Sequence, residues 1–203
     1  MSYPMVLISG DRDLPDGYGY LHEPSGRVFR FDKPWACDNG AFSGFDEGAF
    51  LSMLGQCPVD ARCLFIAMPD VVGEWARTLA LWRQWSPMVR ALGYPLAVVL
   101  QDGATVPSVP WDTCDAVFVG GSTRFKESPG ARTIMSYALA RGKWVHMGRV
   151  NGRTRYRYAA GIGVQSVDGS SFSRFPDTVI AKAEAWKQEP IPRDIPSQLE
   201  LTL

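Results

Sequence analysis

The feature that most constrains the fold is a short apolar run that ends in glycine, aspartate or asparagine and recurs along the chain. Several of these runs are continuously apolar rather than alternating, which is typical of strands covered on both faces, as in a parallel sheet. The runs are MVLISG (5–10), WACDNG (35–40), CLFIAMPD (63–70), PLAVVLQDG (95–103), AVFVGG (116–121), WVHMG (144–148) and VQSVDG (164–169). Together they indicate an α/β protein with parallel strands.

Helical patterns separate the strand candidates. Residues 73–93 carry apolar side chains at steps of three and four, which predicts one helix, and Pro87 predicts a kink or a split in it. Residues 129–142 begin with proline and end with glycine, as helices often do, and residues 176–188 predict a closing helix. We expect one domain over residues 1–188 and an extended or mobile Pro-rich tail over residues 189–203.

Polar residues and glycines follow the strand candidates at their C-terminal ends. In a (β/α) barrel these ends converge on one mouth, whereas an open sheet spreads them along an edge. Six strand candidates contribute: Asp38 with Asn39, Asp70, Gln101 with Asp102, Gly120 with Gly121, His146, and Asp168. We therefore expect a compact or reduced (β/α)8 TIM-like barrel. Helices should be shortened or missing, because 203 residues is near the lower limit for eight units.

The amino-acid composition limits the class of protein but indicates no binding partner. Lys plus Arg equals Asp plus Glu at 21 each, so the overall charge gives no sign of nucleic acid or membrane. No segment reaches the roughly 18 apolar residues that a membrane span needs, and the N-terminus lacks a basic signal region. We expect a soluble cytoplasmic protein with four buried free thiols and no metal site. The sequence gives no indication of the oligomeric state.

The segments CDNGAF (37–42) and GIGVQSVDGSSFSR (161–174) carry Asp38 and Asp168 with Arg174. Between them lie AMPD with Asp70, VVLQDG with Gln101, VFVGG with its glycine pair, and HMGRVN (146–151). In this order the segments resemble the tRNA-guanine transglycosylase superfamily, over roughly residues 36–174. The resemblance includes the superfamily's DNA-acting branch, which inserts 7-deazaguanines.

The resemblance implies that an N-glycosidic bond is cleaved with Asp168 as nucleophile and Asp38 as general acid/base. It implies that Asp70 and Gln101 read the edge of the base, and that Gly120 and Gly121 let the backbone approach it. Phe42 and Met147 are candidates for stacking on the base. We expect no cofactor.

The basic cluster after the sixth strand candidate is a candidate for nucleic-acid phosphates. Arg149, Arg153 and Arg155, with Lys126 from the preceding loop, are the local candidates, and the alternative is a solvated helix face. Arg174 joins them because the resemblance places an arginine there. The superfamily's zinc site has no counterpart because no cysteine follows Cys114, and its long tRNA-holding insertions are absent, so DNA is favoured over tRNA.

Other interpretations of the same residues remain open. Asp168 and Asp38 each precede or approach a glycine and suit turns, Asp70 suits a helix N-cap, and Asp102 suits a turn. His146 is expected to be a hydrogen-bonded strand-end histidine and His22 to lie in a loop. The sequence leaves base exchange and base removal equally open. Two other functions remain: an enzyme on free nucleosides or phosphorylated metabolites with GGST (120–123) as a phosphate loop, and an inactive binding module.

Overall fold

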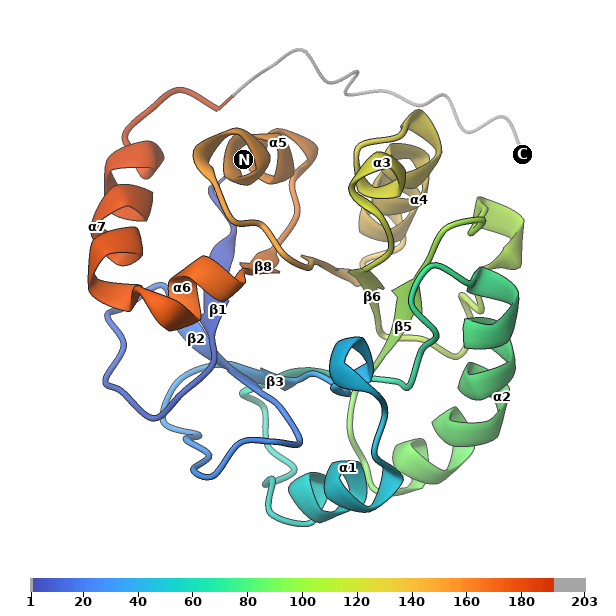
Figure 1. The fold of residues 1–203 in the computed structure, drawn as a ribbon. Helices are drawn as coiled ribbons and strands as arrows, with labels where there is room; N and C mark the ends of the chain where they lie inside the picture. The colour runs from blue at the N-terminus through green and yellow to red at the C-terminus, as the bar shows by residue number, and fades with distance from the viewer. Residues whose placement is uncertain (1, 192–203) are drawn as a thin grey trace.

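The computed structural model describes residues 2–191, which form a closed barrel of eight parallel strands (Figure 1). Each strand pairs with its neighbours in sequence order, and β8 closes the barrel on β1. The strands are β1 (Met5–Ile8), β2 (Tyr18–His22), β3 (Trp35–Cys37), β4 (Cys63–Ala67), β5 (Leu96–Leu100), β6 (Ala116–Val119), β7 (Trp144–Met147) and β8 (Ser166–Asp168). The predicted α/β TIM-like barrel is confirmed.

Helices surround most of the barrel, and beside β2 Figure 1 shows loops in blue instead. The α-helices are α1 (Glu47–Leu54), α2 (Trp75–Ala91), α3 (Thr123–Lys126), α4 (Pro129–Ala140), α5 (Arg153–Ile162), α6 (Ser170–Arg174) and α7 (Pro176–Lys187), and the 3-10 turns are η1 (Ala41–Ser43) and η2 (Val106–Ser108). Loops 9–17 and 23–34 replace helices on either side of β2, and only η2 lies between β5 and β6. The expectation of shortened and missing helices is therefore confirmed.

The strands send alternate side chains into two separate apolar cores. The larger core, here called the outer core, lies between the strands and the helices. The smaller core fills the inside of the barrel with Leu7, Leu21, Ala36, Phe65, Ala67, Ala97, Val99, Ala116 and Phe118. Because of this alternation, two consecutive residues at a strand end reach different surroundings, and only one of them faces the barrel axis.

Strand β2 is the element that the sequence analysis did not predict, and His22 belongs to it rather than to a loop. The His22 side chain is 3% exposed, its Nε2 bonds the backbone oxygen of Arg30 at 2.9 Å, and its ring packs on Phe31. Burial lowers the pKa of His22 to about 4. The strand holds Gly19 because an added Cβ there would collide with the carbonyl oxygen of Pro34.

Helix α2 runs without a break through Pro87, so the helix is not split. Its buried face continues on both sides of the proline, with Trp82 before it and Val89 after it packed into the outer core. Tertiary packing thus holds the helix together where the backbone loses one hydrogen bond. Helices α4 and α7 match the two other predicted helices.

The predicted tail begins at residue 189, and its residues 192–203 lie outside the described residues. Within residues 2–191, no helix is long and apolar enough to cross a membrane.

Candidate active site

A pocket of about 620 Å³ opens at the C-terminal ends of the strands. That volume lies within the usual range for small-molecule sites, and this end of a barrel is where catalytic groups collect. Every strand contributes at least one lining residue at or just beyond its C-terminal end: Ser9, Glu23, Asp38 with Asn39, Asp70, Gln101, Gly120, Arg149, and Asp168. The convergence expected from the sequence is therefore present in the structure.

Asp168 is the last residue of β8, and neighbouring strands fix its carboxylate. His146 Nε2 lies 3.0 Å from Asp168 Oδ1, within hydrogen-bond distance, and the backbone N–H of Arg149 donates to the same oxygen at 3.2 Å. Within the described residues, Oδ2 accepts no hydrogen bond, and Asp168 lines the pocket. Asp168 therefore has one anchored oxygen and one oxygen free to meet a ligand.

His146 lies inside the barrel with no exposed surface, and both ring nitrogens have partners. Trp144 Nε1 donates to Ser166 Oγ at 2.8 Å, and Ser166 Oγ lies 2.9 Å from His146 Nδ1. The serine hydroxyl can donate to Nδ1, which leaves the ring proton on Nε2, facing Asp168. His146 is thus a hydrogen-bonded strand-end histidine, as expected, and it orients the candidate nucleophile.

Asp38 follows β3 and lines the same pocket. Burial, together with the charge of Asp168, raises the pKa of Asp38 to about 7, while the backbone N–H of Gly40 acts in the opposite direction. That N–H donates to Asp38 Oδ1 at 3.1 Å, so the turn interpretation of this segment is also correct. A carboxyl group with a pKa near 7 can give or take a proton at neutral pH.

Asp70, Asn39 and Gln101 form a connected polar wall on one side of the pocket. Asn39 Nδ2 donates to Asp70 Oδ1 at 2.8 Å, and Gln101 Nε2 donates to Asp70 Oδ2 at 2.6 Å. The backbone N–H of Gly73 donates to Gln101 Oε1 at 2.8 Å. Burial raises the pKa of Asp70, against the effect of both amides. The N-cap of α2 is Glu74, so the capping interpretation of Asp70 is wrong.

The two glycines after β6 both line the pocket, and each also has a packing reason. A Cβ on Gly120 would lie 2.8 Å from Gln101 Nε2, and Gly121 adopts a φ of +71° that favours glycine. The next residue, Ser122, donates from its N–H and its hydroxyl to the two oxygens of Asp102, at 2.8 and 2.6 Å. Asp102 thus fastens one loop to another, consistent with the turn role expected for it.

The pocket mouth carries two arginines and an exposed aromatic ring. The Arg149 guanidinium lies over the Phe42 ring, 4.6 Å from its centroid, and Phe42 is 72% exposed. Arg174, the last residue of α6, is exposed at the rim. Met147 does not reach the pocket. It is fully buried in the outer core, because its neighbour His146 takes the inward-facing position on β7.

The remaining predicted phosphate ligands lie elsewhere. Arg153 pairs with Glu189 at 2.6 Å, and Arg155 pairs with Glu127 at 3.0 Å, and neither lines the pocket. These two match the alternative of a solvated helix face. Lys126 does line the pocket, but it is only 2% exposed and is therefore not a surface ligand.

Glu23, Ser9 and Ser173 line the pocket and were missed by the sequence analysis. Ser9 Oγ donates to Glu23 Oε1 at 2.7 Å, and the Ser9 N–H donates to Ser173 Oγ at 3.2 Å. The strand-end rule would have found Glu23 if β2 had been recognised, because it directly follows that strand. Ser9 directly follows β1, and no signal marks Ser173.

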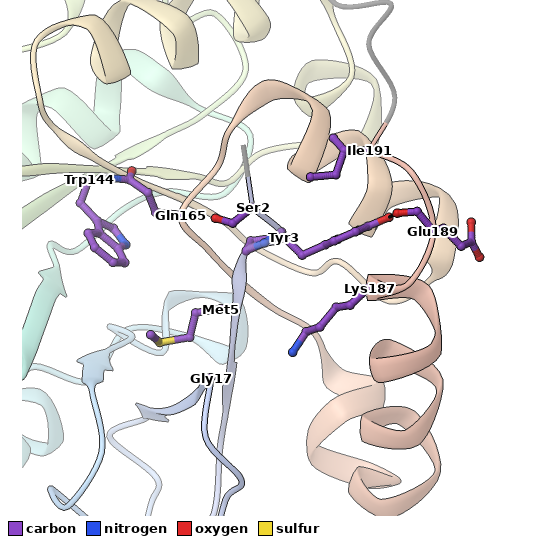
Figure 2. Close-up of a pocket in the computed structure, with 10 residues that line it drawn as sticks. Ser2, Tyr3, Met5, Gly17, Trp144, Gln165, Lys187, Glu189 and Ile191 are labelled. Atoms are coloured by element: carbon purple, nitrogen blue, oxygen red, sulfur yellow. Dashed lines mark hydrogen bonds between the residues drawn. The ribbon is translucent and has the colours of Figure 1, made fainter.

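A second pocket, of about 700 Å³, lies at the opposite end of the barrel (Figure 2). Tyr3, Met5, Trp144 and Gln165 line it beside the starts of β1, β7 and β8. Lys187 also lines it, but its amine already pairs with Glu184 at 2.7 Å. This end of a barrel normally serves stability, so we take the first pocket as the candidate active site.

The four cysteines are buried free thiols, as expected. Cys37 and Cys57 lie with their sulfurs 3.7 Å apart in the outer core. Among residues 2–191, no cluster of three or more histidine, cysteine or acidic side chains is arranged to hold a metal ion.

Comparison with known proteins assigns no family. No family model matches the sequence, and no curated protein matches it. Among solved structures, 67 chains are similar. One is in the crystal structure of the BexX/CysO complex of Amycolatopsis orientalis, with 12% identity and a TM-score of 0.42 over 79% of this chain and 71% of the other. A similarity this low supports no conclusion about function, and the resemblance to the transglycosylase superfamily remains a prediction.

Proposed function

We propose that the protein cleaves an N-glycosidic bond of a nucleotide in nucleic acid, with DNA favoured over tRNA. The observation that carries the proposal is a pair of carboxyl groups in one pocket with contrasting surroundings. Asp168 receives two N–H donors on one oxygen, whereas burial raises the pKa of Asp38 to about 7. By analogy, most glycoside hydrolases use such a pair, one carboxyl group ionised and one able to donate a proton.

In the proposed reaction, Asp168 Oδ2 attacks C1′ or stabilises the positive charge that develops on the sugar. Asp38 donates its proton to the departing base, which otherwise leaves as an anion. A second nucleophile then bonds to C1′ and displaces the Asp168 carboxylate. A base of the 7-deazaguanine type gives exchange, and water gives base removal. In both cases Asp38, now deprotonated, accepts the proton that the incoming group loses.

The wall of Asp70, Asn39 and Gln101 suits the edge of a purine-like base. Each Asp70 oxygen keeps a lone pair beyond the amide hydrogen bond it accepts, so the carboxylate can receive N–H donors from a base. The amides hold that carboxylate in place before the base arrives. Phe42 offers an exposed ring for stacking, and Arg149 and Arg174 offer guanidinium groups for phosphates.

The alternative of a phosphate loop at GGST (120–123) receives less support. The N–H and hydroxyl of Ser122 already bind the Asp102 carboxylate, which occupies the donors that a phosphate would need. An enzyme acting on a free nucleoside without that loop stays an alternative, and the substrate test distinguishes it.

The test incubates the protein with DNA, tRNA and free nucleosides, with and without 7-deazaguanine bases, followed by nucleoside mass spectrometry and detection of abasic sites. We expect base exchange or base loss on DNA, and loss of that activity in Asp168→Asn. Asp102→Asn is the matched control, because this strand-end carboxylate lies outside the pocket lining. Near-normal turnover in Asp168→Asn would overturn the mechanism, and activity on free nucleosides alone would overturn the substrate class.

A further inference from the structure

Lys126 carries a buried amine that the proposed reaction does not use. The side chain is 2% exposed at the end of α3, and its Nζ donates to the carbonyl oxygen of Gly148 at 2.7 Å. That is the one hydrogen bond of Nζ within the described residues, and no carboxylate there lies within ion-pair distance of it. A buried ammonium group without a carboxylate partner is costly, so a purely structural role would favour an apolar side chain.

The surroundings of Lys126 favour the neutral amine. Burial, together with the charges of Arg149 and Arg155, lowers the pKa of Lys126 to about 8, whereas Asp168 and Asp102 act in the opposite direction. At pH 7 a lysine with that pKa is neutral in about a tenth of the molecules, a few hundred times more than an ordinary lysine. The neutral amine is the nucleophilic form.

Gly148 links this amine to the candidate nucleophile Asp168. A Cβ on Gly148 would lie 3.3 Å from Asp168 Oδ1 and 2.6 Å from the Phe118 ring, so the position requires glycine. The carbonyl of the same residue holds the lysine amine. Lys126, Gly148 and Asp168 all line the pocket that also contains Asp38.

We propose that Lys126 forms a Schiff base with the C1 aldehyde of an open-chain pentose 5-phosphate unit. The Nζ lone pair forms a bond to C1 as the C=O π bond breaks, and the carbonyl oxygen takes a proton from Asp38. The Asp38 carboxylate then takes one of the two protons from the attached nitrogen, which leaves a neutral carbinolamine. The carbinolamine then loses its hydroxyl group and the remaining amine proton as water, which leaves a C=N bond without any change in oxidation state. Arg149 and Arg174 at the mouth suit the phosphate group.

Two sources share this chemistry: an abasic sugar within DNA and a free pentose phosphate. The test uses the full chain with an oligonucleotide that carries one preformed abasic site, and separately with 2-deoxyribose 5-phosphate, each with cyanoborohydride to reduce the imine. Intact-mass spectrometry measures the adduct, and peptide mapping locates it. Both probes carry the aldehyde ready-made, so the result does not depend on cleavage of a glycosidic bond.

We expect one adduct per chain, located at Lys126, with a yield that rises between pH 6 and pH 8 as the amine loses its proton. Lys126→Met should lower the yield at least about tenfold, since only weakly reactive protonated lysines remain. Lys143→Met is the matched control, because Lys143 also donates to a carbonyl, that of Cys114 at 2.7 Å, but at the start of β7.

An adduct with the oligonucleotide alone assigns the site to abasic nucleic acid, and an adduct with the free sugar alone assigns it to a metabolite. Absence of any adduct, or labelling spread evenly over surface lysines, would overturn the proposal. If Lys126→Met fails to fold, peptide mapping of the adduct in the wild-type chain still shows whether Lys126 is the residue that reacts.

Discussion

Asp38 gives the candidate site its sharpest pH dependence. The general acid must be protonated, and burial with the nearby Asp168 charge raises the pKa of Asp38 to about 7. Above that pH the protonated fraction falls, so kcat/KM should fall about tenfold per pH unit. In Asp38→Asn this alkaline limb should disappear and kcat should drop by roughly 10²- to 10⁴-fold. A pH–rate profile between pH 5 and 9 checks both, and an unchanged limb in the variant would remove Asp38 from the mechanism.

His146 acts on the reaction through Asp168. A hydrogen bond to a charged group contributes about 1.5–3 kcal/mol, so His146→Leu should lower kcat roughly 10- to 100-fold with little change in KM. His146→Gln places an N–H where Nε2 lies and should recover part of that loss. Steady-state kinetics of both variants, with circular dichroism to verify folding, give the measurement. Equal losses in the two variants would indicate that His146 only fills space.

Four site residues could be predicted individually because they directly follow or end apolar runs. Asp38, Asp70, Gln101 and Asp168 all line the pocket. Met147 could not be placed, because a continuously apolar strand gives no indication of which residues face the barrel axis. In β7 the His146 side chain faces the barrel axis. Because side chains alternate along a strand, Met147 faces the outer core.

At the level of elements, β2 was missed for two physical reasons. Its sequence, YGYLH, contains a glycine that weakens the strand signal, and no helix separates it from β1 or β3. The glycine is needed for close packing against Pro34, which is a tertiary contact that local sequence does not reveal. Missing this strand also hid Glu23, its contribution to the pocket.

Helix α5 provides a comparison between arginines that face the pocket and arginines that do not. Arg149 lines the mouth just before the helix, whereas Arg153 on the first turn pairs with Glu189. We expect Arg149→Ala to weaken DNA binding and to reduce the slope of log affinity against log salt by about 0.9, the effect of one phosphate contact. Arg153→Ala should leave both nearly unchanged. Fluorescence anisotropy at several salt concentrations measures them, and equal slopes for the two variants would contradict this division.

On the scale of the whole molecule, barrel closure turns eight separate strand ends into one site. Closure follows from the repetition of apolar runs and was predictable even with one strand missing, because the others already required a common mouth. The depth at which each polar group lies was not predictable. It depends on strand register and on the loops that cover the mouth, and it determines which groups titrate abnormally.

Two such groups should act on stability in opposite directions between pH 4 and 6.5. Buried His22 has a pKa lowered to about 4, so the unfolded chain binds more protons and stability rises with pH. Asp38 has a pKa raised to about 7, so the folded chain binds more protons and stability falls with pH. In the wild type the two pH dependences of stability oppose each other. A variant that lacks one of the two groups should therefore show the pH dependence of the other.

Relative to wild type, Asp38→Asn should therefore gain stability as the pH rises from 4 to 6.5, and His22→Gln should lose it. The difference for His22→Gln should approach about 3 kcal/mol over the window, since 1.36 kcal/mol corresponds to each unit of pKa change. Urea unfolding at closely spaced pH values measures both variants against wild type, so all other titrating groups cancel. Parallel stability curves for the three proteins would mean that neither group is buried in the way that the barrel places it.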